Sequence, residues 1–197
     1  FVNTLFTISN LPKQNMTDEE FINYKLDWLI NNQKDELIAI FLDKNNEFPN
    51  KKKIIKYLVD ENISKANFNQ ACQNIKLISQ DVKDSYLEQF KIICLIKDNK
   101  KNEAQLILDL LREQKLSNKF FDNKINYLLG LSDKVDVKID DNNLLNFYLS
   151  SITIPDFTYL PSKQTSKKIW QYLTAANLIK VNDFEKKEQI KELEIAA

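Results

Sequence analysis

The chain has 197 residues, with 28 basic and 28 acidic side chains and therefore a formal net charge of zero at pH 7. This balance, together with the presence of Arg112 as the sole arginine, argues against a nucleic-acid-binding face. Histidine is absent and Gly130 is the one glycine, so the commonest general base, the commonest catalytic zinc ligand and phosphate-binding glycine loops are missing. The composition therefore predicts a protein that is not an enzyme and that holds no cofactor and no metal ion.

The first half of the chain predicts an irregular N-terminal segment over residues 1–16, followed by helices. Apolar residues recur at helical spacing from there on. Thr17 and Glu20 have the spacing of a capping box, which opens the first helix, and Asn31 and Asn32 end it. Further helices are expected at about 34–44, 50–63, 64–78 and 82–96, with polar turns between them.

Cap residues suggest where individual helices begin and end. Asn50, after Pro49, is expected to begin the third helix, and Ser64 is expected to cap the fourth. Gly130 follows the apolar stripe of a later helix, where a left-handed C-cap is favoured. The helical spacing also places Tyr24, Leu37 and Leu110 among the inward-facing residues.

The second half predicts further short helices, interrupted by one extended stretch. After a polar turn at 98–101, helices are expected at about 102–114, 117–130 and 141–151. Two prolines then predict an extended connection over 152–164. Helices at 165–179 and 182–197 follow, the last opened by Asn182 and Glu185 in the positions of a capping box.

About ten short helices joined by short polar links predict an all-α fold. Such links favour antiparallel neighbours, so the expected architecture is an α-solenoid of stacked helical hairpins, although a closed bundle fits the same spacing. The predicted organisation is an irregular segment (1–16), a helical-repeat array (17–151), the proline-containing connection (152–164) and a C-terminal hairpin (165–197). The chain is expected to continue into a longer protein.

One stretch resembles a helical hairpin of the tetratricopeptide family. The resemblance rests on a small residue, Ala104, that follows a polar turn and lets two helices approach closely. The matching positions are Tyr86–Leu87–Glu88–Gln89–Phe90, Cys94, Asp98–Asn99, Asn102–Glu103–Ala104 and Leu110–Leu111. The family's Trp–Leu–Gly–Tyr signature and its regular period are missing elsewhere, so the resemblance implies a tetratricopeptide-like architecture only.

A second resemblance covers more of the chain. The order Gln70–Ala71–Cys72, Phe90, Cys94, the 99–111 hairpin and 120–130 is similar to uncharacterised helical-repeat proteins of alphaproteobacterial type. It implies a longer bacterial repeat protein, compatible with export, and it supplies no catalytic residues.

Cys72 and Cys94 are the two cysteines of the chain. They lie on consecutive predicted helices at comparable heights, so a disulfide across that hairpin is possible if the two Cα atoms lie within about 7 Å. The alternative is a pair of buried free thiols that fill an apolar core. A disulfide favours the periplasm or the cell envelope, whereas free thiols favour the cytosol.

The extended connection carries the apolar residues Ile154, Phe157, Tyr159 and Leu160. They either cover the helical core or form a site where a partner docks. The leading hypothesis is a non-catalytic helical-repeat scaffold that binds another protein, or neighbouring repeats of its own chain. The alternative is a regulatory helical domain that binds a peptide or a small apolar ligand. No nucleic-acid partner and no integral membrane segment are expected.

Overall fold

The structure is a computed structural model that describes residues 15–44, 51–77 and 84–179. Within these ranges every regular element is an α-helix, which confirms the expected all-α fold. The helices are α2 (Asp18–Asn31), α3 (Asp35–Lys44), α4 (Lys51–Ser64), α5 (Phe68–Ile75), α6 (Ser85–Lys97), α7 (Lys101–Glu113), α8 (Lys119–Leu129), α9 (Leu144–Thr153) and α10 (Lys167–Ala175). None of these helices is both long and apolar enough to cross a membrane.

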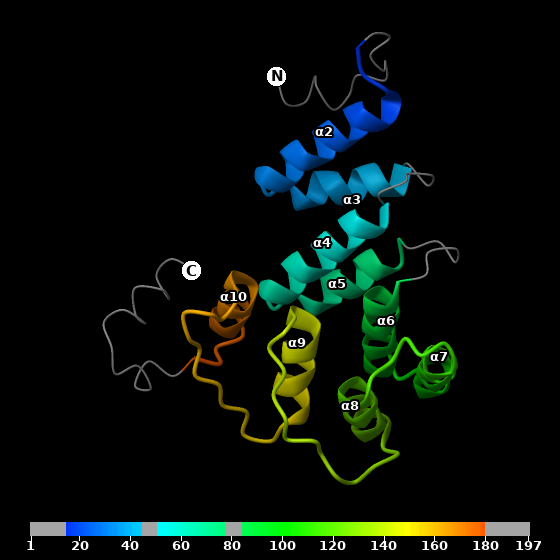
Figure 1. The fold of residues 1–197 in the computed structure, drawn as a ribbon, viewed down its shortest axis with the longest axis vertical. Coiled ribbons are helices and arrows are strands. Elements are labelled where there is room, and N and C mark those ends of the chain that lie inside the picture. Colours follow the sequence, from blue (N-terminus) through cyan, green and yellow to red (C-terminus); the bar gives the residue numbers. More distant parts are fainter. Residues whose placement is uncertain (1–14, 45–50, 78–83, 180–197) are drawn as a thin grey trace.

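The helices follow one another through the molecule and then return to its middle. Figure 1 shows α2, α3, α4 and α5 in succession along the long axis, with α6, α7 and α8 beyond them. The chain then returns, because α9 and α10 both pack against α4. Helix α4 is thus the centre of the fold, and its Ile55, Leu58 and Val59 are fully buried.

Local capping confirms two of the boundaries expected from the sequence. At the start of α2 the Glu20 amide donates to the Thr17 hydroxyl oxygen at 3.2 Å, and the Thr17 amide donates to the Glu20 carboxylate at 2.7 Å. Gly130 ends α8 with a φ of 80°, in the left-handed region where a side chain is disfavoured. Both caps are local: Thr17 and Glu20 bond to each other's main chain, and Gly130 adopts the left-handed conformation because it has no Cβ.

The expected cap at Ser64 is wrong. Ser64 lies in the last turn of α4, where its hydroxyl donates to the Glu61 carbonyl at 2.8 Å. A serine that bonds back along its own helix is compatible with the helix continuing. Helix α5 is capped by Asn67, whose side-chain oxygen accepts from the Gln70 amide at 3.3 Å.

Three expected core residues are instead exposed. Tyr24 is 60% exposed, Leu110 45% and Leu37 36%. In α7 the buried face follows Ala104 and Leu111, so Leu110 lies beside it and not on it. In α2, α3 and α7, which carry these residues, the buried stripe is narrower than the run of apolar residues because part of each helix surface faces solvent.

The extended connection begins two residues later than expected, because α9 continues to Thr153. Residues 154–166 contain no helix, and Ser166 then caps α10. Several predictions fall outside the described residues: most of the N-terminal segment, the cap at Asn50, the start of a helix at Val82, and the last helix at 182–197.

Candidate binding groove

A groove of about 530 Å³ lies between α3, α4 and α5. Its walls differ in chemistry: α5 and one turn of α4 present side-chain amides, whereas α3 presents apolar and acidic groups. The lining residues are Asp35, Glu36, Ala39, Ile40, Leu58, Asn62, Lys65, Asn67, Gln70 and Asn74.

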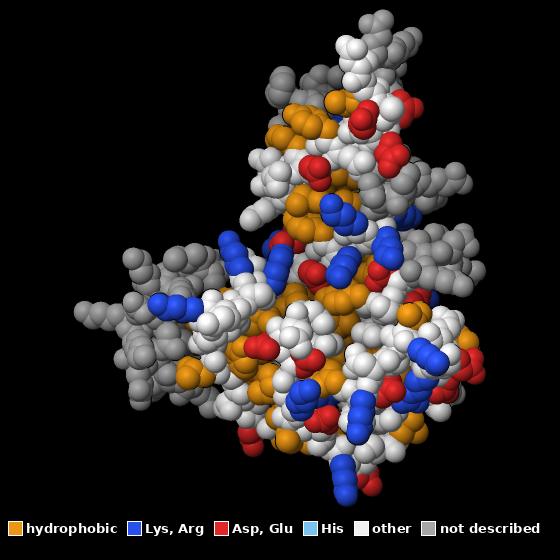
Figure 2. Space-filling view, viewed as in Figure 1, with side chains coloured by type: hydrophobic (Ala, Val, Ile, Leu, Met, Phe, Trp, Pro, Cys, Tyr) orange, Lys and Arg blue, Asp and Glu red, His pale blue; other side chains and the backbone are white. Residues whose placement is uncertain are grey.

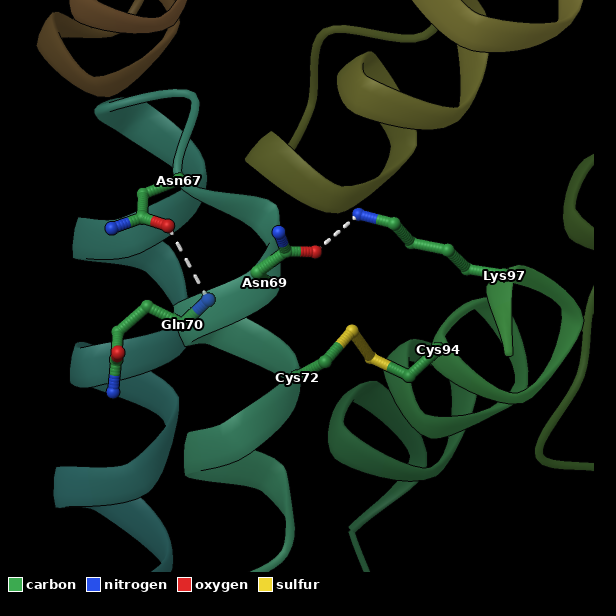
Figure 3. The surroundings of a disulfide bond; sticks show 6 residues. All are labelled: Asn67, Asn69, Gln70, Cys72, Cys94 and Lys97. Atoms are coloured by element: carbon green, nitrogen blue, oxygen red, sulfur yellow. Dashed lines mark hydrogen bonds between the residues drawn. A yellow bond between two sulfur atoms is a disulfide. The ribbon is translucent and has the colours of Figure 1, made fainter.

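The amide wall follows one side of α5. Asn67, Gln70 and Asn74 recur at a spacing of three and four residues, which places them on one face of a helix. Figure 3 shows Asn67 and Gln70 together on one side of α5, with Cys72 on the other. Asn62, from α4, completes this wall and is already bound, because its amide donates to the Leu58 carbonyl at 2.8 Å.

Asn74 is the exceptional member of this wall. It is 3% exposed, and its side-chain amide makes no hydrogen bond with any described group. Buried amides nearly always have a partner, because an unpaired one loses its hydration without compensation. The groove therefore contains a donor and an acceptor that no described group of the protein satisfies.

The opposite wall combines an apolar surface with a fixed charge pair. Ile40 is 52% exposed beside Ala39 in the groove lining. Asp35 accepts from the Lys65 ammonium at 2.6 Å and from the Tyr57 hydroxyl at 3.1 Å. Burial raises the pKa of Tyr57, and the neighbouring Asp35 carboxylate adds to this rise. Tyr57 therefore stays a neutral donor that helps hold α3 against α4.

The two cysteines form a disulfide between α5 and α6, as one of the two alternatives predicted. The Cα atoms of Cys72 and Cys94 are 5.6 Å apart. The Lys97 ammonium donates to the Asn69 side chain at 2.6 Å one turn away, so a polar contact flanks the covalent one (Figure 3). The disulfide anchors the helix that carries the amide wall, on the side away from the groove.

The suggested docking residues of the extended connection differ in exposure. The rings of Phe157 and Tyr159 meet Phe147 of α9 edge-on, with centroids 5.6 Å and 4.8 Å away. Ile154 is partly buried, whereas Leu160 is 58% exposed. The aromatic residues thus contribute to covering α9, and Leu160 is the member of this set that is free to meet a partner. These residues lie apart from the groove lining.

A second, smaller cavity of about 330 Å³ lies between α8 and the loop that follows it. Beside it Lys124 is fully buried, and its ammonium donates to the main-chain carbonyl of Asp136. The Asp136 carboxylate accepts from the Lys138 amide at 2.9 Å and from Asn123 at 3.2 Å. These bonds lower the pKa of Asp136. The polar groups at this cavity thus hold the loop against α8.

Two acids of α4, the half-buried Asp60 and the buried Glu61, bond to side chains of neighbouring helices. The Tyr86 hydroxyl donates to Asp60, and the Lys168 ammonium of α10 donates to Glu61. Burial raises the pKa of Asp60, opposed by the Tyr86 hydrogen bond and the nearby lysines. Burial also lowers the pKa of Lys168. Each acid has a partner, so this cluster joins helices.

Among the described residues, no three His, Cys, Asp or Glu side chains lie close enough together to hold a metal ion. The polar groups of the groove are neutral amides, one exposed acid and an internally paired Asp–Lys couple. Amides bind by donating and accepting hydrogen bonds and are not nucleophiles or general bases. The groove is therefore suited to recognition.

Sequence reasoning did not find this groove. The spacing of Asn67, Gln70 and Asn74 was the available signal, since it places three amides on one face of a helix. In a chain rich in asparagine such a spacing carries little weight by itself. The opposing residues on α3 lie more than twenty positions earlier, and only packing brings them across from the amides.

Comparison with known proteins finds no match: no family model, no curated protein and no solved structure resembles this chain significantly. The tetratricopeptide-like resemblance thus remains a prediction, and the functional argument rests on the residues and geometry of the chain.

Proposed function

We propose that this chain is a non-catalytic helical-repeat scaffold that binds a protein partner in the groove between α3, α4 and α5. The groove carries the proposal, because it combines a wall of side-chain amides, of which Asn74 has no partner among the described residues, with an exposed apolar wall on a helical framework. Such a combination provides both hydrogen bonds and apolar contact area to a polypeptide. The architecture we propose is an α-solenoid of tetratricopeptide-like antiparallel hairpins, supported by the consecutive packing of α4 on α5 and of α6 on α7.

The disulfide bears on where the partner is found. Disulfides persist in oxidising compartments, so the Cys72–Cys94 bond supports the periplasm or cell envelope as the place of action. Intact-mass measurement after alkylation, with and without prior reduction, on protein from its native host tests this. If both cysteines are alkylated without prior reduction, they are free thiols in the native host, and the proposal becomes an intracellular scaffold.

Site-specific cross-linking followed by pull-down in the source organism tests the scaffold function. An Ile40→Glu variant places a charge on the apolar wall and is expected to lose the partner. Leu106→Glu is the matched control, because Leu106 is 63% exposed on α7, outside the groove lining. A partner that both variants retain equally would contradict the use of this groove.

A regulatory domain that binds a small ligand is the second candidate. The volume of the groove lies within the range of small-molecule sites, which is the observation in its favour. Such a site is usually lined mainly by apolar groups, whereas here amides and charges make up much of the wall. A metabolite screen that raises the melting temperature of the native chain but not of the Ile40→Glu variant would favour this alternative.

A further inference from the structure

We propose that the groove recognises an extended segment of its partner through the segment's main-chain peptide groups, an inference that rests on the proposed function. The side-chain amide of Asn74, which pairs with no group among the described residues, is the starting point. A primary amide has both a donor and an acceptor, as does a peptide group, and the two pair without regard to side-chain identity. An incoming main chain therefore supplies the hydrogen bonds that Asn74 lacks.

The spacing of the amide wall suits such a ligand. Gln70 and Asn74 are four residues apart, which corresponds to about 6 Å along a helix. Alternate residues of an extended strand, which present their peptide groups to the same side, repeat at about 6.7 Å. The longer Gln70 side chain can accommodate the small difference. Asn67, whose side-chain nitrogen donates to no described group, extends the row by one further turn.

The opposite wall adds a preference for side chains. In an extended peptide, side chains alternate between two faces that stand perpendicular to the direction of the peptide hydrogen bonds, and in this binding mode one of these faces lies toward α3. There Ile40 and Ala39 offer an apolar surface, and Glu36 is an exposed carboxylate with no ion pair to any described group. The geometry thus favours a peptide with an apolar residue close to a basic one.

A phage-displayed library of random twelve-residue peptides tests this inference on the complete chain with its disulfide intact. Enriched peptides are synthesised, each also as a copy with N-methylated main-chain amides. We expect Asn74→Leu and N-methylation each to weaken binding at least tenfold. Gln73→Ala, which changes an exposed amide of α5 outside the groove lining, is the matched control and is expected to leave affinity unchanged.

Folding of the Asn74→Leu variant is measured separately, because a lost fold would also abolish binding. Removing an unpaired buried amide is expected to leave the melting temperature unchanged or to raise it. The inference is overturned if no peptide is enriched, or if enriched peptides bind Asn74→Leu or survive N-methylation undiminished. If the partner is still captured in a manner sensitive to Ile40→Glu while these tests fail, the scaffold function stands and the extended-peptide mode alone is rejected.

Discussion

At the scale of single residues, polar groups with a structural role differ from those of the binding groove in whether they have a hydrogen-bonding or ionic partner. Asp60, Glu61 and Lys124 are ionisable, and each has a partner that compensates for its burial. Asn74 is comparably buried and has none among the described residues. Unpaired buried groups cost free energy, so their presence indicates a use outside the fold.

The half-buried Asp60 gives the stability of the chain a defined dependence on pH. Burial raises its folded-state pKa above 3.8, so the folded chain binds more protons than the unfolded chain between those two values. Stability that Asp60 contributes at low pH is therefore lost as the pH rises through its folded-state pKa. Asp60→Asn removes this titration and keeps an oxygen that accepts from Tyr86.

We accordingly expect Asp60→Asn to become more stable relative to the native chain as the pH rises from below 3.8 toward neutrality. Urea unfolding at a series of pH values measures the difference in free energy. A difference that does not vary with pH would show that Asp60 does not titrate abnormally in the folded chain.

At the scale of elements, most helices end in the same way. Six of them end in a residue with positive φ whose backbone hydrogen bonds are those of a Schellman motif. These residues are Gln33, Ala66, Asn99, Lys115, Gly130 and Asn177. Glycine is favoured at such a position, yet only one of the six is glycine.

Replacing the non-glycine residues at these helix ends should stabilise the chain. Ala66 and Lys115 are exposed and have φ values of 54° and 57°. We expect Ala66→Gly and Lys115→Gly each to raise the free energy of unfolding by about 1 kcal/mol, because the left-handed conformation strains residues that carry a Cβ. Thermal and urea unfolding measure this. Gly130→Ala is the reverse control and should destabilise by a similar amount; nothing lies within 4 Å of the added Cβ.

The disulfide between Cys72 and Cys94 covalently joins α5 and α6. It closes a loop between residues 22 positions apart, which corresponds to about 3 kcal/mol in the chain-entropy view. We expect the Cys72→Ala/Cys94→Ala double variant to lose about this amount in urea unfolding. The native chain in reductant should approach the double variant in stability. Equal stability of the native chain with and without reductant, with the thiols shown to be free, would contradict a structural role.

Variants of the extended connection (residues 154–166) can distinguish a role in covering the helical core from a role in docking a partner. Phe157 packs on Phe147 and is partly buried, so Phe157→Ala should cost about 2 kcal/mol of stability. Leu160→Ala should change stability by less than about 0.5 kcal/mol, since this side chain is mostly exposed. Unfolding and partner capture are measured on both variants. A docking role for Phe157 would instead appear as lost capture with unchanged stability.

At the scale of the whole molecule, α10 packs against α4 although more than half of the sequence separates the paired residues of the two helices. Lys168 and Glu61, which form the ion pair at this contact, are 107 positions apart. A strict stack of repeats contacts only nearest neighbours, so this contact adds a long-range connection. In Figure 2, lysine side chains and apolar surface lie close together on the visible face of the molecule.

Breaking the Lys168–Glu61 ion pair should weaken the packing of α10 on α4 and lower the free energy of unfolding. Lys168→Met leaves the buried Glu61 without its principal partner; among the described residues, Lys65 at 3.6 Å is the remaining one. We expect a loss of about 2 kcal/mol, below the value for a fully buried pair because Lys168 is partly exposed. In the Glu61→Gln background the same change should cost less, and a double-mutant cycle by urea unfolding measures the difference. Equal costs in both backgrounds would contradict the coupling.

The sequence predicted correctly those features that depend only on residues close together in the chain. The Thr17–Glu20 capping box and the left-handed Gly130 depend on contacts within a single turn, and both are as predicted. The helical spacing of apolar residues likewise predicted the all-α fold. Ser64 was misassigned because its hydroxyl has two local partners available, and the choice between them depends on where α4 ends.

The sequence by itself therefore determined the all-α class and local features such as the caps at Thr17 and Gly130. Only the tertiary structure decided which apolar residues are exposed, that α10 packs on α4, and that the amides of α5 face the apolar wall of α3. Contacts between residues far apart in the chain leave no local pattern. Asn74 shows the difference: its place on a helical face follows from spacing, whereas its burial without a partner among the described residues depends on how three helices pack.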